Sequence, residues 1–210
     1  MSQLNLYTMC GSSKCTRDAV VQTMTPANTK THYPIPHSEL IDEVEASLEA
    51  AGLHTVEEAH ALSPDGQRYF GMMQLEFEDE EMDFKTILGL RNSHDKTFSA
   101  GLVLGSRVLV CDNLCFSGEI KVQRKHTRTI SESLPQLVWD AIGKVSGVRE
   151  TQMKRIEAYK GYEINDAYAH DIIIQGLDHG AITSTKIPHV LKEWRDPRHE
   201  DFKPRTLWSL

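Results

Sequence analysis

The chain has 210 residues, of which 40% are hydrophobic and 25% are charged. This balance is ordinary for a folded globular protein, so intrinsic disorder is not expected. The net charge of −7 argues against a protein that coats nucleic acid non-specifically. No apolar run approaches the length of a membrane span, and the first residues lack the pattern of a signal peptide. We therefore expect a cytoplasmic protein with one substantial domain, or one domain with a helical appendage.

The N-terminal third predicts one strong helix after an extended segment. Thr16 is expected to cap a short helix that runs through Met24. Three prolines in "TPANTKTHYPIPH" then favour extended chain, and the two histidines of "HYPIPH" are a weak metal signal. Apolar residues at helical spacing follow in "ELIDEVEASLEAAG", with Ser38 as the expected N-cap and Gly52 as the stop.

From residue 55 the hydrophobic period changes to that of strands. "TVEEAHAL" and "QRYFGMMQL" flank the turn sequence "SPDG", which predicts a β-hairpin. The acidic stretch "EFEDEEMD" (76–83) is expected to be a solvated loop. Further strands are expected in "KTILGLRN" and in "GEIKVQRK". Between them, "TFSAGLVLG" and "SRVLVCDN" are expected to form either one strand broken at Gly105 or two strands. Five or six strands with short polar breaks predict an antiparallel meander.

The C-terminal part is predicted to be helical. Ser131 or Ser133 is the expected cap of "LPQLVWDAIGKVSG", a second helix covers about 150–160, a third begins near Asn165, and Thr185 caps "KIPHVLKEW". The apolar ending "RTLWSL" indicates docking onto the domain, or a natural chain that continues. The predicted fold class is α+β: an N-terminal segment, helix and antiparallel sheet core in 1–130, and a helical part in 131–210 that packs on the sheet within the same compact domain.

The motif "RNSHDKT" (91–97) is either a plain hairpin turn or a cluster of reactive groups. Its residues are good turn formers. His94 and Asp95 supply a base and an acid beside Ser93, but adjacent residues point to opposite faces of a strand, so a linear Ser-His-Asp triad is excluded. We expect a structured turn that presents a ligand-facing edge for an anion or a metal.

A second polar cluster comprises "CDNLC" (111–115) and "RKHT" (124–127). Asp112 offers a metal ligand, and Lys125 with His126 offers a phosphate site. The alternative is a turn followed by a basic edge strand. If the strands at 85–91 and 97–111 pair as a hairpin, "NSHDK" and "CDN" lie at opposite ends of it. One site joining all of these motifs is then not expected, unless Gly101 or Gly105 breaks the register.

The four cysteines lie at C-x4-C and C-x3-C spacing. Together they permit a zinc site of four thiolates, although neither pair has the tight C-x2-C spacing. The alternative is that all four are free thiols, as is usual without a secretory signal. The candidate ligands are Cys10, Cys15, Cys111 and Cys115.

The polar motifs resemble those of a phage- and plasmid-encoded family catalogued as domain of unknown function 932. The resemblance rests on the "RNSHDKS"-like turn at 91–97, the "VxVCDNLxFSG" segment at 108–118 and the "KHT" at 125–127, and it extends to 59–71 and 193–202. The family has no assigned activity. Its usual home on mobile elements implies a role in their DNA metabolism or in countering host defence, and the element order is similar to that of single-strand-annealing recombinases.

Three functions remain open. The first is binding of nucleic acid, such as single-stranded DNA, with Tyr69 or Phe98 stacking on bases. Its candidate nucleic-acid or anion-binding residues are Arg91, Asn92, Lys96, Arg107, Lys121, Arg124, Lys125 and Arg128. The second is hydrolysis of a phosphodiester or nucleotide, with a divalent metal as the candidate cofactor. Its candidate catalytic residues are His94, Asp95, Asp112 and His126. The third is non-catalytic inhibition of a host defence protein. No membrane partner is expected, and an oligomer is compatible with each function.

Overall fold

The computed structural model describes residues 4, 6–8, 10–77, 85–106, 109–110 and 116–210, with only the backbone of 109–110. These residues fall into two compact units, Met1–Arg149 and Glu150–Leu210, which are described separately below. Among the described helices, none is both long and apolar enough to cross a membrane.

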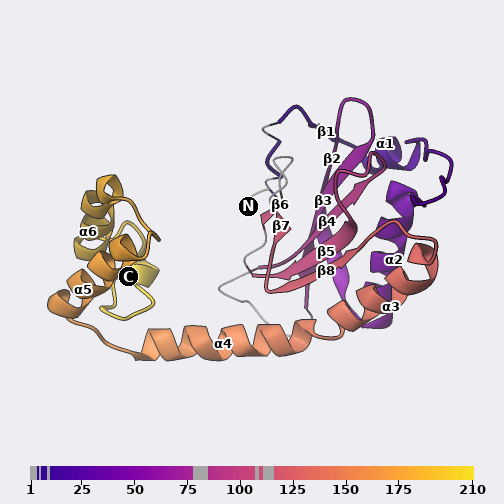
Figure 1. Cartoon of the computed structure of the whole chain (residues 1–210). Coiled ribbons are helices and arrows are strands. Elements are labelled where there is room, and N and C mark those ends of the chain that lie inside the picture. Colours follow the sequence, from indigo (N-terminus) through magenta and orange to yellow (C-terminus); the bar gives the residue numbers. More distant parts are fainter. Residues whose placement is uncertain (1–3, 5, 9, 78–84, 107–108, 111–115) are drawn as a thin grey trace. The chain divides into compact units, whose positions relative to one another are not determined.

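The first unit is built on a six-stranded antiparallel sheet (Figure 1). Its strands, in spatial order, are β1 (Ser13–Cys15), β2 (His54–Leu62), β3 (Arg68–Glu76), β4 (Thr86–Ser93), β5 (Ala100–Gly105) and β8 (Ile120–Arg124). A separate two-stranded pair is formed by β6 (Leu109–Val110) and β7 (Phe116–Ser117). Neighbours in the chain are neighbours in the sheet from β1 to β5. The predicted α+β class with an antiparallel meander is confirmed.

One face of the sheet is covered by α2 (His37–Ala50) and α3 (Ile130–Ile142), with the short α1 (Arg17–Val21) beside α2 (Figure 1). The helices supply apolar stripes because their buried residues recur at helical spacing. The buried cluster under them includes Leu40, Ile41, Val44, Leu88, Leu90, Leu102, Leu134 and Val138. Burying each such side chain stabilises the fold by about 1.5–3 kcal/mol.

Strand β4 is buried on both faces. Its side chains point alternately to the two faces of the sheet, and this decides the direction of the polar side chains at the end of the strand. Leu88 and Leu90 face the helices, and Asn92 follows them at the same two-residue spacing. Arg91 lies between Leu90 and Asn92 in the sequence, so its side chain points to the opposite face of the sheet. That second face holds a smaller apolar cluster that includes Leu6, Phe70, Met72, Val103 and Phe116.

Several helix starts differ from the predicted caps. Thr16 does cap α1, since its Oγ1 accepts from the amide of Ala19, but the helix ends at Val21 and not at Met24. Ser38 is not a cap, because α2 already begins at His37, after Pro36. Neither predicted serine caps α3, which begins at Ile130 after Thr129.

The structure also decides between one and two strands after residue 97. Strand β5 ends at Gly105, whose φ of 150° lies outside the usual range for other residues, and a Cβ there would meet the Glu119 carboxylate. The chain therefore breaks at this glycine, and the next described strand is the short β6. The acidic stretch was expected to be a loop. Most of it, 78–84, lies outside the described residues.

The second unit has its own small core. It contains α5 (Asp166–Asp178), α6 (Ile187–Arg195), the 3-10 turns Ser184–Lys186 and Glu200–Phe202, and most of α4 (Val145–Gly161), which spans the boundary between the units. Buried Ile164, Ala169 and Trp194 form the core, with Leu207 and Leu210 packed against it. The apolar chain end thus docks within this unit.

The two predicted helix starts in this unit have different outcomes. The helix expected to begin near Asn165 is α5, and Asn165 caps it by accepting from the amide of Tyr168 at 2.9 Å. Thr185 does not cap α6, because it lies inside the preceding 3-10 turn and Lys186 takes the N-cap position. Of the helices expected to pack on the sheet, α3 does so, whereas the buried residues of α5 and α6 belong to the separate core of the second unit.

Candidate functional site

Asn92 is the centre of a buried polar network between the sheet and the segment before α2. Its side chain is fully buried, and both of its polar atoms are used. The amide nitrogen donates to the carbonyl oxygen of Ile35 and to Nδ1 of His37, at 3.0 Å each. The amide oxygen accepts from Nε2 of His126 at 2.7 Å. Asn92 was predicted to be a turn former, but it belongs to β4 and lies in the core.

The hydrogen-bond partners show which nitrogen of each surrounding imidazole carries a proton. His37 accepts at Nδ1, so its proton sits on Nε2, which donates to the carbonyl of Gly66 at 3.0 Å. His94 donates from Nε2 to the carbonyl of Ile35 at 2.9 Å. His32 donates from Nε2 to the carbonyl of His94 at 3.1 Å. Because the His37 ring accepts at one nitrogen and donates from the other, its partners assign it as neutral.

Burial disfavours the charged form of three of these imidazoles, His37, His94 and His126. It lowers the pKa of His37 to about 3, and the neighbouring His94 and His126 contribute in the same direction. Burial also lowers the pKa of His126 to about 4, with further contributions from His32 and His94. The pKa of His94 is lowered by burial as well. The rings of His37 and His94 stack with centroids 3.9 Å apart, so a proton on one ring would face its neighbour at close range.

The extended segment before α2 brings three of these groups to β4. Pro34 and Pro36 hold it extended on either side of Ile35, whose carbonyl serves both Asn92 and His94. The amide of Tyr33 donates to the carbonyl of His126 at 2.9 Å, which ties the segment to the chain after β8. Sequence reasoning missed this network. Its signal was the pair of histidines in "HYPIPH", which form hydrogen bonds here.

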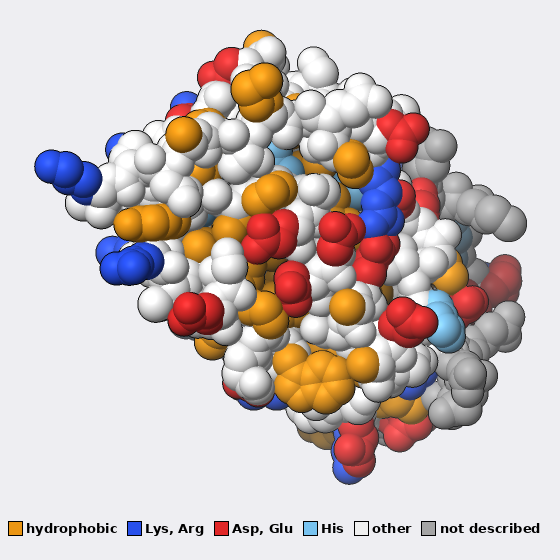
Figure 2. Space-filling view, turned by 90° about the vertical axis from the view of Figure 1, so that its right-hand side faces the viewer, with side chains coloured by type: hydrophobic (Ala, Val, Ile, Leu, Met, Phe, Trp, Pro, Cys, Tyr) orange, Lys and Arg blue, Asp and Glu red, His pale blue; other side chains and the backbone are white. Residues whose placement is uncertain are grey.

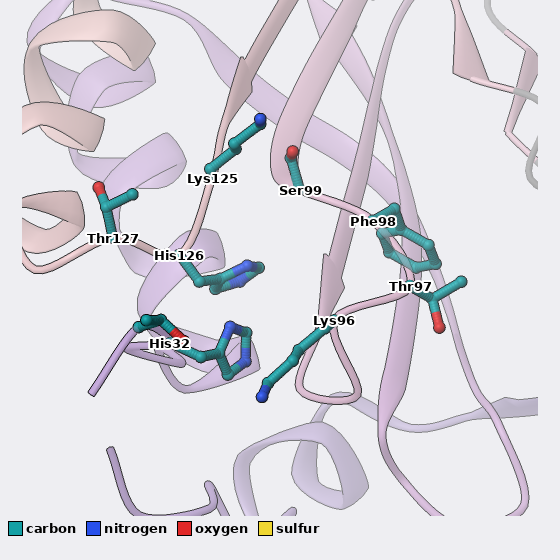
Figure 3. Close-up of a pocket in the computed structure, with 9 residues that line it drawn as sticks. His32, Lys96, Thr97, Phe98, Ser99, Lys125, His126 and Thr127 are labelled. Atoms are coloured by element: carbon teal, nitrogen blue, oxygen red, sulfur yellow. The ribbon is translucent and has the colours of Figure 1, made fainter. Parts of the chain in front are cut away.

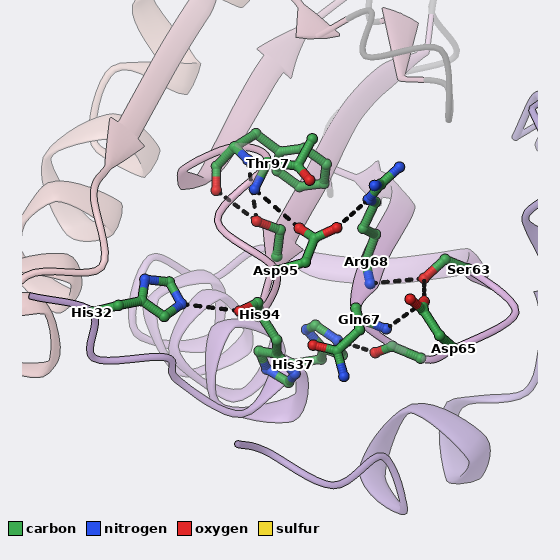
Figure 4. A network of polar contacts seen from close by, with 12 residues as sticks. His32, His37, Ser63, Asp65, Gln67, Arg68, His94, Asp95 and Thr97 are labelled. Atoms are coloured by element: carbon green, nitrogen blue, oxygen red, sulfur yellow. Dashed lines mark hydrogen bonds and ion pairs between the residues drawn. The ribbon is translucent and has the colours of Figure 1, made fainter. Parts of the chain in front are cut away.

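The predicted turn is present but begins only after Ser93 (Figure 4). Ser93 closes it by accepting from the amide of Phe98 at 3.1 Å and donating to the carbonyl of Phe98 at 2.8 Å. Asp95 accepts from the amide of Thr97 at 3.0 Å and from Nε of Arg68 at 2.6 Å, which joins the turn to the neighbouring hairpin. These contacts lower the pKa of Asp95 against the opposing effect of burial. His94 and Asp95 therefore bind different partners. This agrees with the expectation that the adjacent Ser93, His94 and Asp95 do not form a catalytic triad.

A pocket of about 400 Å³ opens beside the network (Figure 3). Its lining residues come from the turn, the end of β8 and the segment before α2: Thr31, His32, Lys96, Thr97, Phe98, Ser99, Lys125, His126 and Thr127. None of these nine residues carries a carboxylate. Lys96 and Lys125 are exposed, and neither makes an ion pair with any residue that the structure describes. The pocket is therefore locally cationic in a chain of net charge −7.

The structure thus brings together two of the predicted clusters. Lys96 of "NSHDK" and the "KHT" residues line one concave surface, and Asn92 links His126 to the same strand end from inside. The third cluster cannot be placed in the same way, because Asp112 lies outside the described residues, as does Arg107. His94 does not line the pocket.

Arg91 occupies a different environment on the opposite face of β4. Its guanidinium carbon lies 4.9 Å from the ring centroid of Phe98 and 4.2 Å from that of Phe116. The residue is 9% exposed, and its guanidinium makes no hydrogen bond or ion pair with any described residue. Burial accordingly lowers its pKa. Two cation–π contacts supply about 0.5–2 kcal/mol each, whereas an uncompensated buried ion costs several kcal/mol.

The other predicted cations are used in different ways. Lys121 donates to the carbonyl of Phe116 at 3.0 Å. Arg124 donates to Oγ1 of Thr129 at 2.8 Å, and Arg128 is exposed. Tyr69 was a candidate for stacking on bases, but this prediction is wrong because the residue is fully buried. Phe98, the other stacking candidate, is partly exposed at the pocket.

The predicted zinc site stays a prediction. Cys10 is exposed and Cys15 is partly buried, which raises the pKa of the Cys15 thiol. Cys111 and Cys115 lie outside the described residues. Within the described ranges, no group of three or more histidine, cysteine or acidic side chains is arranged to hold a metal ion.

Comparison with protein families matches residues 27–209 to the family described as "Domain of unknown function (DUF932)". The matched range contains the whole polar network and the whole pocket, from Thr31 to Thr127. No curated protein and no solved structure shows significant similarity to the chain.

Proposed function

The chain belongs to the domain-of-unknown-function family DUF932, and we propose that it binds single-stranded nucleic acid by its phosphate backbone at the pocket between Lys96 and Lys125. The observation that carries this proposal is the pocket itself. It has two exposed lysines that pair with no described residue, and no carboxylate among the residues that line it. A lysine ammonium offers three donors and a full positive charge, which suit a phosphate oxygen.

The rest of the pocket suits the same ligand. The hydroxyls of Ser99, Thr97 and Thr127 add neutral hydrogen-bonding groups around the two charges. Arg128 is exposed next to this lining in the sequence and extends the positive charge. The buried network fixes His126 at the pocket wall. The site is therefore rigid on its inner side, and its charged ends are free to meet a ligand.

The backbone of Lys96 supports a functional role for this side chain. Its φ of 68° is in the left-handed region, and among the described residues other than glycine it is alone in this. A residue with a Cβ costs about 1–2 kcal/mol in this conformation. Strain of this kind persists where surrounding contacts enforce it, and it is common at ligand sites. Here the contacts of Ser93 and Asp95 enforce it.

A single strand fits the molecule better than a duplex does. Phe98 lines the pocket and is partly exposed, and base stacking on an aromatic ring contributes about 1–3 kcal/mol. The helical face of the sheet is strongly acidic (Figure 2): α2 carries five acidic residues, α3 carries two, and neither contains a lysine or arginine. A duplex that wrapped around this unit would be repelled there.

The wider setting is part of the same proposal. The resemblance to proteins of phages and plasmids supports a role in the DNA metabolism of mobile elements, with annealing of single strands as the activity. Hydrolysis is less well supported, because His94 and His126 both use Nε2 to hold neighbouring residues and His94 does not line the pocket. We therefore propose binding without cleavage.

The test is the salt dependence of oligonucleotide binding, measured by fluorescence anisotropy with a labelled oligothymidine. The double variant Lys96→Gly/Lys125→Ala should bind more weakly. The slope of log Kobs against log salt should fall in magnitude by about 1.4, because each phosphate contact to a single strand contributes about 0.7.

The matched control is Lys144→Ala, which removes an exposed lysine away from the pocket. It should leave both affinity and slope near those of the wild type. The proposal is contradicted if the double variant behaves like Lys144→Ala, or if the wild type does not bind at low salt. Cleavage of the oligonucleotide in the presence of Mg²⁺ would instead favour the hydrolase.

A further inference from the structure

The least explained charged group in the first unit is Arg91. Two other arginines of this unit have charged partners. Arg17 pairs with Glu45, and Arg68 pairs with Asp95 at 2.6 Å. Arg91 is more deeply buried than either, yet its guanidinium makes no hydrogen bond or ion pair within the described part of the chain. A buried guanidinium normally has its N–H groups bonded, whereas Nε of Arg91 is buried without a hydrogen-bond partner among the described residues.

The surroundings of Arg91 hold it in place without using its donors. Phe98 and Phe116 contact the guanidinium as aromatic rings, and such contacts are made by ring faces and use no N–H group. Lys121 brings a second positive charge to the same ring, with Nζ 5.7 Å from the centroid of Phe116. Two cations thus share one aromatic cluster, and no carboxylate pairs with either of them among the described residues.

We propose that Arg91 and Lys121 form a second oxyanion site, on the face of the sheet turned away from α2 and α3. The ligand is a singly charged oxyanion of the phosphate type, which a guanidinium binds through two parallel N–H···O bonds. The rings of Phe98 and Phe116 exclude water from one side of this site. This strengthens the attraction between the ions.

The position of Phe98 connects the two sites. Phe98 is one of the residues that line the pocket of Lys96, and its ring contacts Arg91 and Phe70 on the other face of the sheet. A nucleic-acid strand that stacks a base on Phe98 is therefore flanked by cations on both sides, and neighbouring phosphodiesters of one strand can occupy the two sites. This extension rests on the proposed function. The oxyanion site itself does not, since free phosphate has the same chemistry.

The direct test is a titration of the full chain with inorganic phosphate against sodium chloride of equal ionic strength, followed by the arginine Nε–H resonances in NMR. The Arg91 resonance is identified by its absence in Arg91→Lys. It should shift saturably with phosphate, and it should still do so in Lys96→Gly/Lys125→Ala. An Arg91 resonance that phosphate does not shift more than chloride does overturns the proposal.

A second measurement covers the case in which the resonance is too broad to follow. Phosphate should raise the melting temperature of the wild type by several degrees more than that of Arg91→Met, because only the wild type has the buried charge to pair. General stabilisation by phosphate acts on both proteins and cancels in this comparison. Equal increments in the two proteins overturn the proposal. If Arg91→Met does not fold, Arg91→Lys takes its place, with an increment smaller than that of the wild type.

Oligothymidine distinguishes the two sources of the anion. If a strand spans both sites, Arg91→Lys weakens oligonucleotide binding and Lys96→Gly/Lys125→Ala weakens it further. If Arg91→Lys leaves oligonucleotide binding unchanged while the phosphate shift persists, the site takes a free anion and the spanning strand is overturned. If neither variant affects the oligonucleotide but phosphate still shifts Arg91, the proposed function fails and the oxyanion site stands.

Discussion

At the scale of single residues, Asn92 is the group on which the site depends. One amide satisfies a carbonyl, an acceptor nitrogen and a donor nitrogen from chain segments far apart in the sequence, at Ile35, His37 and His126. Few other side chains offer two donors and an acceptor in this size. Asn92 therefore stabilises the fold mainly by giving hydrogen-bond partners to buried polar groups that would otherwise have fewer.

Asn92→Leu should be strongly destabilising. Leucine has a similar size but leaves two imidazole nitrogens, Nδ1 of His37 and Nε2 of His126, buried without partners, at about 1–3 kcal/mol each. The Ile35 carbonyl also loses one of its two hydrogen bonds and keeps the one from His94. Urea unfolding should show a loss of about 3 kcal/mol or more. The comparison is Arg68→Ala, which removes a partly exposed ion pair worth roughly 1 kcal/mol or less. Similar losses in the two variants would show that the network contributes little.

Lys96 provides a second test at this scale. Here a glycine variant should be more stable than an alanine variant, which reverses their usual order of stability. Glycine is normally less stable than alanine in a folded segment, but at a φ of 68° the Cβ of alanine is strained. Lys96→Gly should therefore be more stable than Lys96→Ala by about 1 kcal/mol. Thermal unfolding of both variants checks this. An alanine variant at least as stable as the glycine variant would mean that the turn is unstrained in solution.

At the scale of elements, the hydrophobic pattern predicted the strands better than it predicted the polar site. The "SPDG" turn and the alternation along β2 and β3 identify their hairpin. By contrast, nothing local in "RNSHDKT" shows that Asn92 and His94 point into the core, because their partners are 34 to 62 residues away in the sequence. Turn propensity therefore favoured a solvated loop, and long-range contacts overrode it.

The network also predicts how stability depends on pH. The pKa values of His37 and His126, about 3 and about 4, lie below the ordinary value near 6.5, so below that pH the unfolded chain binds more protons than the folded one. Stability is therefore complete above about pH 6.5 and is lost as the pH falls toward the folded values. The loss approaches about 1.4 kcal/mol per pH unit for each histidine.

His126→Gln isolates one part of this pH dependence. Glutamine can still donate to the amide oxygen of Asn92 but does not titrate. Between about pH 6.5 and pH 4, the free energy of unfolding of this variant should fall less steeply than that of the wild type. Urea unfolding across this range checks it. Parallel curves for the two proteins would show that His126 is not held neutral by the fold.

At the scale of the whole molecule, the first unit separates its charges. The acidic residues of α2 and α3 lie over one face of the sheet, whereas the exposed Lys96 and Lys125 lie at the pocket beyond the ends of β4 and β8 (Figures 2 and 3). The net charge of −7 hides this separation. Composition could thus exclude non-specific coating of nucleic acid, but it could not locate a cationic pocket, which exists only once the turn after β4 meets the end of β8.

The most direct test of the central claim is a map of where oligothymidine contacts the protein, from backbone amide shifts of the full chain in NMR. If the strand binds at the pocket, the largest shifts fall at residues 31–32, 96–99 and 125–127, and the acidic helices α2 and α3 are unaffected. Saturable shifts that instead concentrate on α2 and α3, or in the second unit, would contradict this claim.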